Sequence, residues 1–220
     1  MAKRAAVIFD LDGTLLNTLD DLTDAVNATM RRFGFPEKTT EEVRLAVGNG
    51  ADKLIERTLP NGAATEGFGD ILRWYREYYS LHSAVKTAPY PGIVELLDAL
   101  RERGCLTAVV SNKQDDAVKL LCRQYFGDRI SAAIGESATV RKKPAPDSLF
   151  AAMRIIGANL EDCVYVGDSD VDIETAKNAD IPCISVSWGF RSEVFLAQHG
   201  AKSIVSSPEL LFDRLTQFFF

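Results

Sequence analysis

The stretch that decides the fold is Ala5-Ala6-Val7-Ile8-Phe9-Asp10-Leu11-Asp12-Gly13-Thr14-Leu15. Residues 5–9 form an unbroken apolar run, which is typical of a strand buried on both faces of a parallel sheet. Asp10 and Asp12 follow where this strand must end, and strand alternation starts both side chains on the same side. Gly13 then allows a sharp turn. Two neighbouring carboxylates are costly unless a cation or a shared proton relieves them. The stretch therefore predicts either a charged site or a simple Asp-Gly turn.

The composition is that of a globular protein with a sizeable core. Of the 220 residues, 46% are hydrophobic, and the net charge of −6 comes from 25 basic and 31 acidic side chains. The acidic balance argues against a nucleic-acid or anionic-membrane surface, and no run of about 18 apolar residues is present to cross a membrane. The apolar run after Lys3 and Arg4 is too short for a signal peptide. We therefore expect a cytoplasmic protein with neither a nucleic-acid nor a membrane partner.

The rest of the chain divides into a helical block and an alternating block. Residues 17–84 show helical apolar spacing and no strand pattern. Thr18 and Asp21 are predicted to cap the first helix of this block as a capping box. From residue 85 onwards strands alternate with helices, which is typical of a doubly wound, Rossmann-like parallel sheet covered on both faces. We predict an α/β core of residues 1–16 and 85–220, with an all-helical domain of residues 17–84 inserted after the first strand.

Further polar clusters fall at or beside predicted strand ends, and their members are Ser111 and Asn112, Lys143, and Asp168 and Asp172. Alone, each has an ordinary explanation: turn chemistry, a solvated basic surface and a helix cap, respectively. Ligands of such sheets bind at the carboxyl ends of the strands, so the coincidence predicts one shared site. Pro144 favours an extended conformation for Lys143, which gives this residue a defined direction that Lys142 lacks.

Together these clusters suit phosphoryl chemistry. Carboxylates from two strand ends make a hard oxygen site suited to Mg²⁺, which keeps several waters and borrows oxygens from phosphate. A hydroxyl, an amide and a lysine supply donors for the remaining phosphoryl oxygens. One carboxylate is then left to attack phosphorus, while its neighbour moves a proton.

The chain resembles the haloacid dehalogenase superfamily in four motifs that occur in order: Asp10-Leu11-Asp12-Gly13-Thr14-Leu15, Ser111-Asn112, Lys143-Pro144 and Gly167-Asp168-Ser169-x-x-Asp172. The helical insertion resembles the type-1 cap of that superfamily. Within it, the chain is most similar to the phosphoglycolate phosphatase group in the stretches Asp20-Asp21-Leu22, Val47-Gly48-Asn49-Gly50-Ala51 and Trp188-Gly189-Phe190-Arg191. Asn17 departs from the pattern, because many relatives carry Asp there.

The resemblance implies a role for each matching residue. Asp10 would attack phosphorus and form an aspartyl-phosphate, while Asp12 would protonate the leaving alkoxide and then deprotonate water. Mg²⁺ would be held by the Asp10 carboxylate, the Asp12 backbone carbonyl and Asp168, with Asp172 supporting them from behind. The phosphoryl group would be held by Ser111, Asn112 and Lys143.

The resemblance also implies that the cap closes over the site and selects the substrate. The candidate specificity loop is Gly48, Asn49 and Gly50, and a helix end with a linker is an equally good explanation of these residues. The expected substrate is a small phosphorylated metabolite, with 2-phosphoglycolate as the first candidate. Its carboxylate would need a donor, for which the sequence offers Arg44, Lys53 and Arg191 without choosing among them.

Other functions stay open at this point. A hexose phosphomutase, similar to β-phosphoglucomutase, would use the same aspartyl-phosphate, but it would convert a sugar 1-phosphate to the 6-phosphate instead of releasing inorganic phosphate. A phospho-accepting signalling module also combines acids, a hydroxyl and a lysine, yet such modules are shorter and lack an insertion like residues 17–84. A P-loop ATPase is excluded because no G-x-x-x-x-G-K-[ST] motif is present. The sequence does not indicate an oligomeric state.

Overall fold

The computed structural model describes residues 5–219, and the chain divides into two compact units. The core unit comprises Met1–Leu16 and Pro89–Phe220, and the helical unit comprises Asn17–Ala88. Lys3 and Arg4, on which part of the expectation about a signal peptide depends, lie outside the described residues. Within residues 5–219, no helix combines the length and the apolar character needed to span a bilayer.

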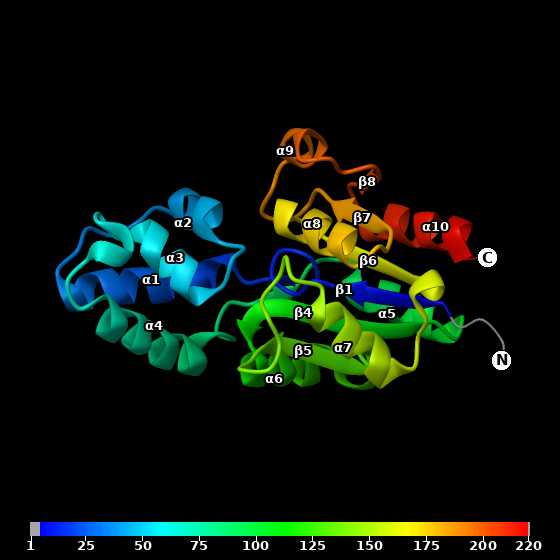
Figure 1. Ribbon diagram of the computed structural model, residues 1–220, viewed down its shortest axis with the longest axis horizontal. Helices are drawn as coiled ribbons and strands as arrows, with labels where there is room; N and C mark the ends of the chain where they lie inside the picture. The colour runs from blue at the N-terminus through cyan, green and yellow to red at the C-terminus, as the bar shows by residue number, and fades with distance from the viewer. Residues whose placement is uncertain (1–4, 220) are drawn as a thin grey trace. The chain divides into compact units, whose positions relative to one another are not determined.

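The strands of the core unit are β1 (Ala6–Phe9), β4 (Leu106–Gln114), β5 (Ala132–Glu136), β6 (Cys163–Gly167), β7 (Cys183–Val186) and β8 (Ile204–Val205). They form one six-stranded parallel sheet in the order β5-β4-β1-β6-β7-β8 (Figure 1). Successive strands are added on one side of β1 as far as β5 and on its other side from β6 onwards. This change of direction at β1 confirms the predicted doubly wound fold. A second, two-stranded sheet pairs β2 (Leu16–Asn17) with β3 (Ala88–Pro89).

The central strand β1 sets the position of the site. All four of its residues are fully buried, as expected of a strand with a neighbour on each side and helices on both faces. Phe9 at its end is in register with Val109 of β4 and with Val166 of β6. The residues that follow these three positions therefore meet at the carboxyl edge of the sheet.

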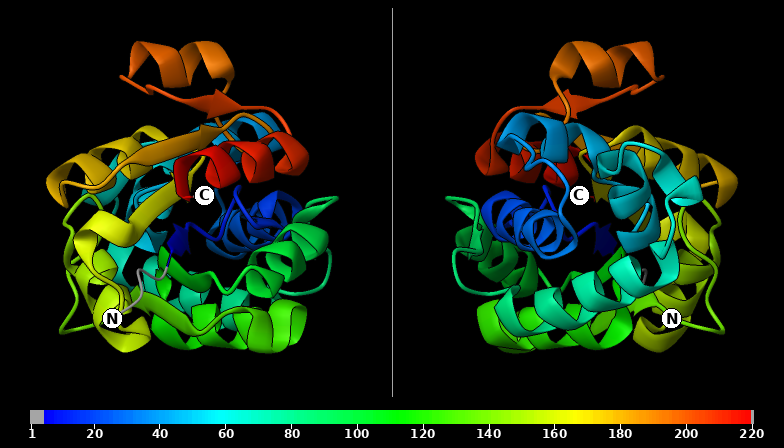
Figure 2. Two further views of the ribbon diagram at one scale, coloured as in Figure 1. Left: turned by 90° about the vertical axis from the view of Figure 1, so that its right-hand side faces the viewer. Right: turned by 90° about the vertical axis from the view of Figure 1, so that its left-hand side faces the viewer.

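Helices cover both faces of the core sheet, and their bounds are α5 (Ile93–Glu102), α6 (Asp115–Phe126), α7 (Asp147–Ile156), α8 (Asp170–Asn178), α9 (Glu193–Gln198) and α10 (Pro208–Phe219), with short 3₁₀ turns at Gly127–Arg129 and Leu160–Asp162. On one face, α7 and α8 pack against Ile8, Val110 and Tyr165. Figure 2 shows α5 and α10 on the opposite face. The sheet is thus buried on both sides, as the apolar strands predict.

The helical unit contains α1 (Leu19–Phe33), α2 (Thr40–Ala46), α3 (Ala51–Thr58), a 3₁₀ turn at Gly62–Ala64 and α4 (Phe68–His82). These helices bury a core of their own, which includes Val26, Met30, Ile55, Ile71 and Tyr75. The helix α2 begins with a capping box of Thr39 and Glu42. The buried apolar faces explain why the helical spacing was readable in the sequence.

Asp21 holds the end of the helical unit and corrects one expectation about its first helix. Its carboxylate accepts hydrogen bonds from the backbone N–H groups of residues 85–87 at 2.9–3.0 Å. These bonds tie the segment to the compact helical unit, which comprises Asn17–Ala88. The predicted capping box of α1 was wrong, because Thr18 makes no side-chain cap bond and Asp21 is used by this more distant segment.

Candidate active site

The chain folds back sharply after β1. Gly13 adopts a φ of +87°, and a Cβ at this position would lie only 2.4 Å from Asp168 Oδ2. Glycine is therefore required both by the backbone angle and by the available space. The same turn lets the Thr14 hydroxyl donate to Asp168 Oδ1 at 3.1 Å. The opening motif and the fourth motif are thus in direct contact.

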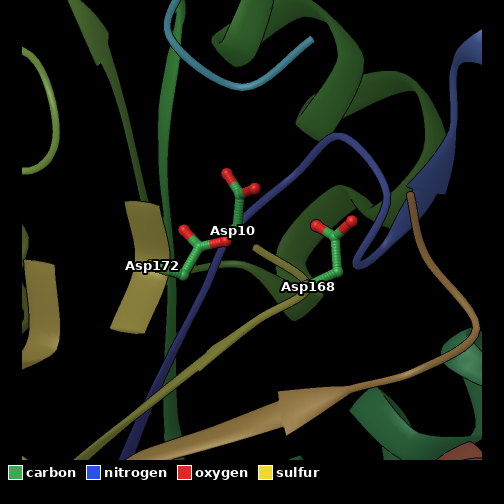
Figure 3. A group of neighbouring side chains, drawn as sticks. All are labelled: Asp10, Asp168 and Asp172. Carbon is green, nitrogen blue, oxygen red and sulfur yellow. The ribbon is translucent and has the colours of Figure 1, made fainter. Parts of the chain in front are cut away.

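Three buried carboxylates gather at the carboxyl edge of the sheet, as Figure 3 shows. Asp10 follows β1, Asp168 follows β6, and Asp172 lies in the first turn of α8; one oxygen of each lies within 4.8 Å of the others. Burial raises the pKa of Asp10 well above its usual value, and burial together with Asp172 raises the pKa of Asp168 to about 7. The three carboxylates are short of positive charge.

Lys143 supplies one positive charge to this group. Its ammonium lies 2.7 Å from Asp10 Oδ1, 2.7 Å from Asp172 Oδ1 and 3.0 Å from the Tyr165 hydroxyl. Burial would lower the pKa of Lys143, but the attraction of Asp10 and Asp172 outweighs it and raises that pKa above its usual value. Lys142, by contrast, pairs with Glu136 at 3.1 Å. The structure places Lys143, and not its neighbour, among the carboxylates.

Asn112 holds the backbone of Lys143. Its side-chain oxygen accepts from the Lys143 N–H at 2.7 Å, and its side-chain nitrogen donates to the Lys143 carbonyl at 3.0 Å. The alternative explanation of Ser111 and Asn112 as a turn does not hold, because β4 continues to Gln114 with an irregular pairing to β5. Ser111 and Asn112 are therefore buried strand residues, and the observed contacts of the Asn112 amide orient the lysine.

Asp12 has a different partner from Asp10. Its Oδ1 lies 3.0 Å from the ammonium of Lys113, whose side chain is only 6% exposed. Sequence reasoning missed Lys113, although it directly follows Ser111-Asn112 and adds a cation to a predicted strand end. The two acids of the opening motif are thus distinguished by their lysines.

Hydrogen bonds fix the other two carboxylates. Asp168 Oδ2 accepts from the backbone N–H of Phe190 at 2.7 Å. Asp172 Oδ2 accepts from the Ser169 hydroxyl at 2.6 Å and from the Ser169 N–H at 3.1 Å, which forms a capping box at the start of α8. The helix-cap explanation is therefore correct for Asp172, which also faces the carboxylate group, whereas Asp168 takes no part in the cap.

A loop after β7 closes the site from the side of the opening turn. Trp188 Nε1 donates to the Thr14 carbonyl at 3.0 Å, and a Cβ on Gly189 would lie 2.4 Å from the Gly13 carbonyl oxygen. Sequence reasoning missed the contacts of Thr14, Phe190 and Tyr165. The resemblance of the stretch Trp188-Gly189-Phe190-Arg191 was the one signal that pointed to this loop.

The candidate specificity loop lies in the helical unit, between α2 and α3. Gly50 is the N-cap residue of α3 with a φ of 86°, and Asn49 Oδ1 accepts from Arg57 Nη2 at 2.7 Å. Arg57 Nη1 also donates to the Ala46 carbonyl at 2.8 Å, at the end of α2. These contacts agree with the helix-end explanation, and a role of Gly48, Asn49 and Gly50 in specificity stays a prediction.

The three candidate donors for a substrate carboxylate are divided between the units. Arg44 pairs with Glu41 at 2.6 Å, and Lys53 pairs with Glu56 at 2.6 Å, both along helices of the helical unit. Arg191 is buried in the core unit, directly after the residue whose N–H binds Asp168. The contacts within each unit do not choose among the three donors.

The donor set of the carboxylate group fits a divalent metal ion. Among residues 5–219, three carboxylates face one ammonium, so a further cation would balance their charge and favour their ionised forms. Oxygen ligands are those that hard cations such as Mg²⁺ prefer. The side chain of Asp12 is not a member of this group, and a role of its backbone carbonyl as a ligand stays a prediction.

A profile of one family, described as haloacid dehalogenase-like hydrolase, matches residues 7–186. The chain belongs to this family. It is 34% identical over 215 residues to phosphoglycolate phosphatase 1 of Pseudomonas aeruginosa, covering 95% of this chain and 76% of the relative. It is also 34% identical over 216 residues to the phosphoglycolate phosphatase of Neisseria meningitidis, covering 93% and 91% of the two chains. These matches confirm the resemblance.

Solved structures of the haloacid dehalogenase-like hydrolases share the fold. A candidate phosphoglycolate phosphatase from Lactobacillus delbrueckii subsp. bulgaricus superposes with a TM-score of 0.92 at 35% identity, covering 97% of this chain and 98% of that one. CbbY from Rhodobacter sphaeroides, solved in complex with phosphate, gives a TM-score of 0.75 at 27% identity over 94% and 96% of the chains. With the sequence matches, they identify this hydrolase as an enzyme of the phosphatase class.

Proposed function

We propose that this hydrolase cleaves phosphomonoesters of small metabolites through an aspartyl-phosphate on Asp10, with Mg²⁺ as cofactor. The observation that carries the proposal is the position of Asp10 at the end of β1. Its carboxylate is in contact with the Lys143 ammonium at 2.7 Å, and it lies beside two further carboxylates. A buried nucleophile next to a fixed cation is what phosphoryl transfer requires of a protein, since its catalysis is mainly positioning and charge stabilisation.

The reaction divides into two displacements at phosphorus. In the first, an Asp10 oxygen bonds to phosphorus, the bond from phosphorus to the ester oxygen breaks, and Asp12 gives its proton to the leaving alkoxide. In the second, Asp12 takes a proton from water as the water oxygen attacks the same phosphorus, which releases phosphate and restores the Asp10 carboxylate. The separate partners of the two acids, Lys143 and Lys113, support this division of roles.

The cation completes the charge balance of the site. Asp10, Asp168 and the backbone carbonyl of Asp12 would hold Mg²⁺, and Asp172 would support the site through its bonds to Lys143 and Ser169. When bound, Mg²⁺ supplies positive charge next to the phosphoryl oxygens. Lys143 offsets the charge between the acids and the incoming phosphoryl group, and Ser111 lies within the neighbouring strand β4.

The substrate proposal is 2-phosphoglycolate. Its support is that relatives over most of the chain, from Pseudomonas aeruginosa and Neisseria meningitidis, are phosphoglycolate phosphatases. We propose in addition that the helical unit serves as a cap, and that Gly48, Asn49 and Gly50 contribute to the choice of substrate.

The first experiment is phosphate release from a panel of phosphorylated metabolites, with Mg²⁺ and with chelator. We expect Mg²⁺-dependent release, with 2-phosphoglycolate among the best substrates. Asp10→Asn should abolish release while leaving the circular dichroism spectrum unchanged, and activity within about tenfold of the parent would exclude Asp10 as the nucleophile. Conversion of a sugar 1-phosphate to the 6-phosphate without release of phosphate would indicate a mutase instead.

The covalent intermediate can be trapped directly. Borohydride reduces an acyl phosphate to an alcohol, so treatment during turnover should convert Asp10 to homoserine. Mass spectrometry of the peptide that contains Asp10 should then show one oxygen replaced by two hydrogens. The same treatment without substrate is the control, and an unmodified peptide under turnover conditions would argue for direct attack by water.

A further inference from the structure

The ammonium of Lys143 uses all of its N–H bonds. An ammonium group carries three donors and no acceptor. Its partners are Asp10 Oδ1 and Asp172 Oδ1, both at 2.7 Å, and the Tyr165 hydroxyl at 3.0 Å. Lys143 can therefore contact a phosphoryl oxygen only by giving up one of these three bonds.

Two of the three partners are held in place by further hydrogen bonds. The Tyr165 hydroxyl accepts from Lys143 and donates its own proton to Asp172 Oδ1 at 2.8 Å, which closes a ring of three bonded groups. Asp172 is also held through its other oxygen by Ser169, at 2.6 Å and 3.1 Å. Tyr165 and Asp172 are both fully buried. Tyr165 and Asp172 are therefore fixed partners of the Lys143 ammonium.

Asp10 is the partner that the proposed chemistry changes. When its oxygen bonds to phosphorus, the carboxylate loses its charge and becomes a weaker acceptor, while the phosphoryl oxygens carry negative charge. The Lys143 N–H that pointed at Asp10 then has a stronger acceptor, which is an oxygen of the phosphoryl group bonded to Asp10. No proton is transferred in this exchange, since Lys143 stays an ammonium throughout.

We propose that Tyr165 is a positioning residue for phosphoryl transfer. The Tyr165 hydroxyl and the Asp172 carboxylate each accept one hydrogen bond from the Lys143 ammonium and keep it in place. The third hydrogen bond of the ammonium changes its acceptor from Asp10 to a phosphoryl oxygen. This inference rests on the proposed function of the site and extends it to a residue outside the four motifs. The ring of Tyr165 also packs beneath α7 and α8, so the positioning role belongs to the hydroxyl alone.

Tyr165→Phe separates the hydroxyl from the ring. We expect the Kd for orthophosphate to rise about tenfold and kcat/KM for p-nitrophenyl phosphate to fall about tenfold, as for the loss of one charge-assisted hydrogen bond. In a Lys143→Met background the same substitution should change both quantities by less than about twofold, because the hydroxyl acts through the lysine. A merely structural role would give the same loss in both backgrounds.

Thr175→Val is the matched control. It removes another buried hydroxyl, whose bond is to the Val171 carbonyl at 2.6 Å within α8, and it should leave both quantities unchanged. Parent-like phosphate affinity and turnover in Tyr165→Phe, or equal losses with and without Lys143, would overturn the inference. If the parent protein released no phosphate from any phosphomonoester, the proposed function would fail by itself, because orthophosphate binding tests Tyr165 without turnover.

Discussion

Replacing Lys143 by methionine removes the ammonium that contacts both Asp10 and Asp172, and Lys142→Met is the matched control. The Lys143 side chain is 3% exposed and lies 2.7 Å from both carboxylates. The Lys142 side chain is 28% exposed and lies 3.1 Å from Glu136. Methionine keeps most of the length of lysine and removes its charge, so the pair compares one substitution in two environments.

The structure predicts losses of different size for the two variants. Removing one partner of a buried ion pair costs roughly 3–5 kcal/mol of the free energy of unfolding, and for Lys143→Met the loss should be largest in chelator. An ion pair that stays in contact with water contributes about 0–1 kcal/mol, so Lys142→Met, at a partly exposed pair, should stay within about 1 kcal/mol of the parent. A lost donor to developing charge lowers kcat by about 10²–10³-fold, which is expected for Lys143→Met alone.

Urea unfolding followed by circular dichroism, and phosphate release in Mg²⁺, should be measured on the same preparations. A folded Lys143→Met protein with kcat within about tenfold of the parent would show that Lys143 does not contact the phosphoryl group. A greater loss in Lys142→Met than in Lys143→Met would show that the wrong lysine had been assigned.

Three other perturbations test neighbouring parts of the site. Lys113→Met removes the partner of Asp12. It should lower kcat about tenfold more for an alkyl phosphate than for p-nitrophenyl phosphate, because only the leaving alkoxide of the alkyl phosphate needs a proton. Equal losses of kcat for the two substrates would contradict a role through Asp12. Gly189→Ala would place a Cβ 2.4 Å from the Gly13 carbonyl oxygen and should lower the free energy of unfolding by about 1–3 kcal/mol. The control Gly69→Ala lies on α4, where a Cβ would meet no atom within 4 Å, and should raise the free energy of unfolding by about 0.5–1 kcal/mol. Urea titrations measure both values. Without metal, the pKa of about 7 for Asp168, against an ordinary 3.8, keeps a proton on the native protein that the unfolded chain has lost, so the free energy of unfolding should fall by up to about 4 kcal/mol as the pH rises from about 4 to about 7. Mg²⁺ should restore stability mainly at the higher pH, and a rise in stability with pH in chelator would contradict this sign.

The core fold was predictable because its signals are local and repeated. Residues 5–9 carry no polar side chain, and the strand within them lies at the centre of the sheet, where only a fully apolar strand fits. The end of β4 was not predictable in the same way. Its last residues, from Ser111 to Gln114, are polar, and they remain extended because of pairing with β5. Such pairing is a property of the folded sheet.

The other residues that the sequence did not assign make side-chain contacts with residues far away in the sequence. Thr18 and Asp21 have the spacing of a capping box, but Asp21 finds backbone donors at residues 85–87. Tyr165 lies in an apolar strand and looks like a core residue, and nothing local shows that its hydroxyl meets Lys143 and Asp172. A sequence motif identifies residues that take part directly in the reaction, and it does not identify residues such as Tyr165 that position them.

The two acids of the opening motif show why position alone did not assign their roles. Asp10 and Asp12 are alike in sequence, and both follow β1, yet each faces a different ammonium. Asp10 shares that of Lys143 with Asp172, so its charge balance depends on the whole carboxylate group and on any cation bound there. Asp12 meets Lys113, which comes from the end of β4. Changes at Lys113 should therefore alter proton transfer and leave phosphate binding intact. Changes at Lys143 should weaken phosphate binding and leave proton transfer by Asp12 intact, so experiments can separate proton transfer from phosphate binding.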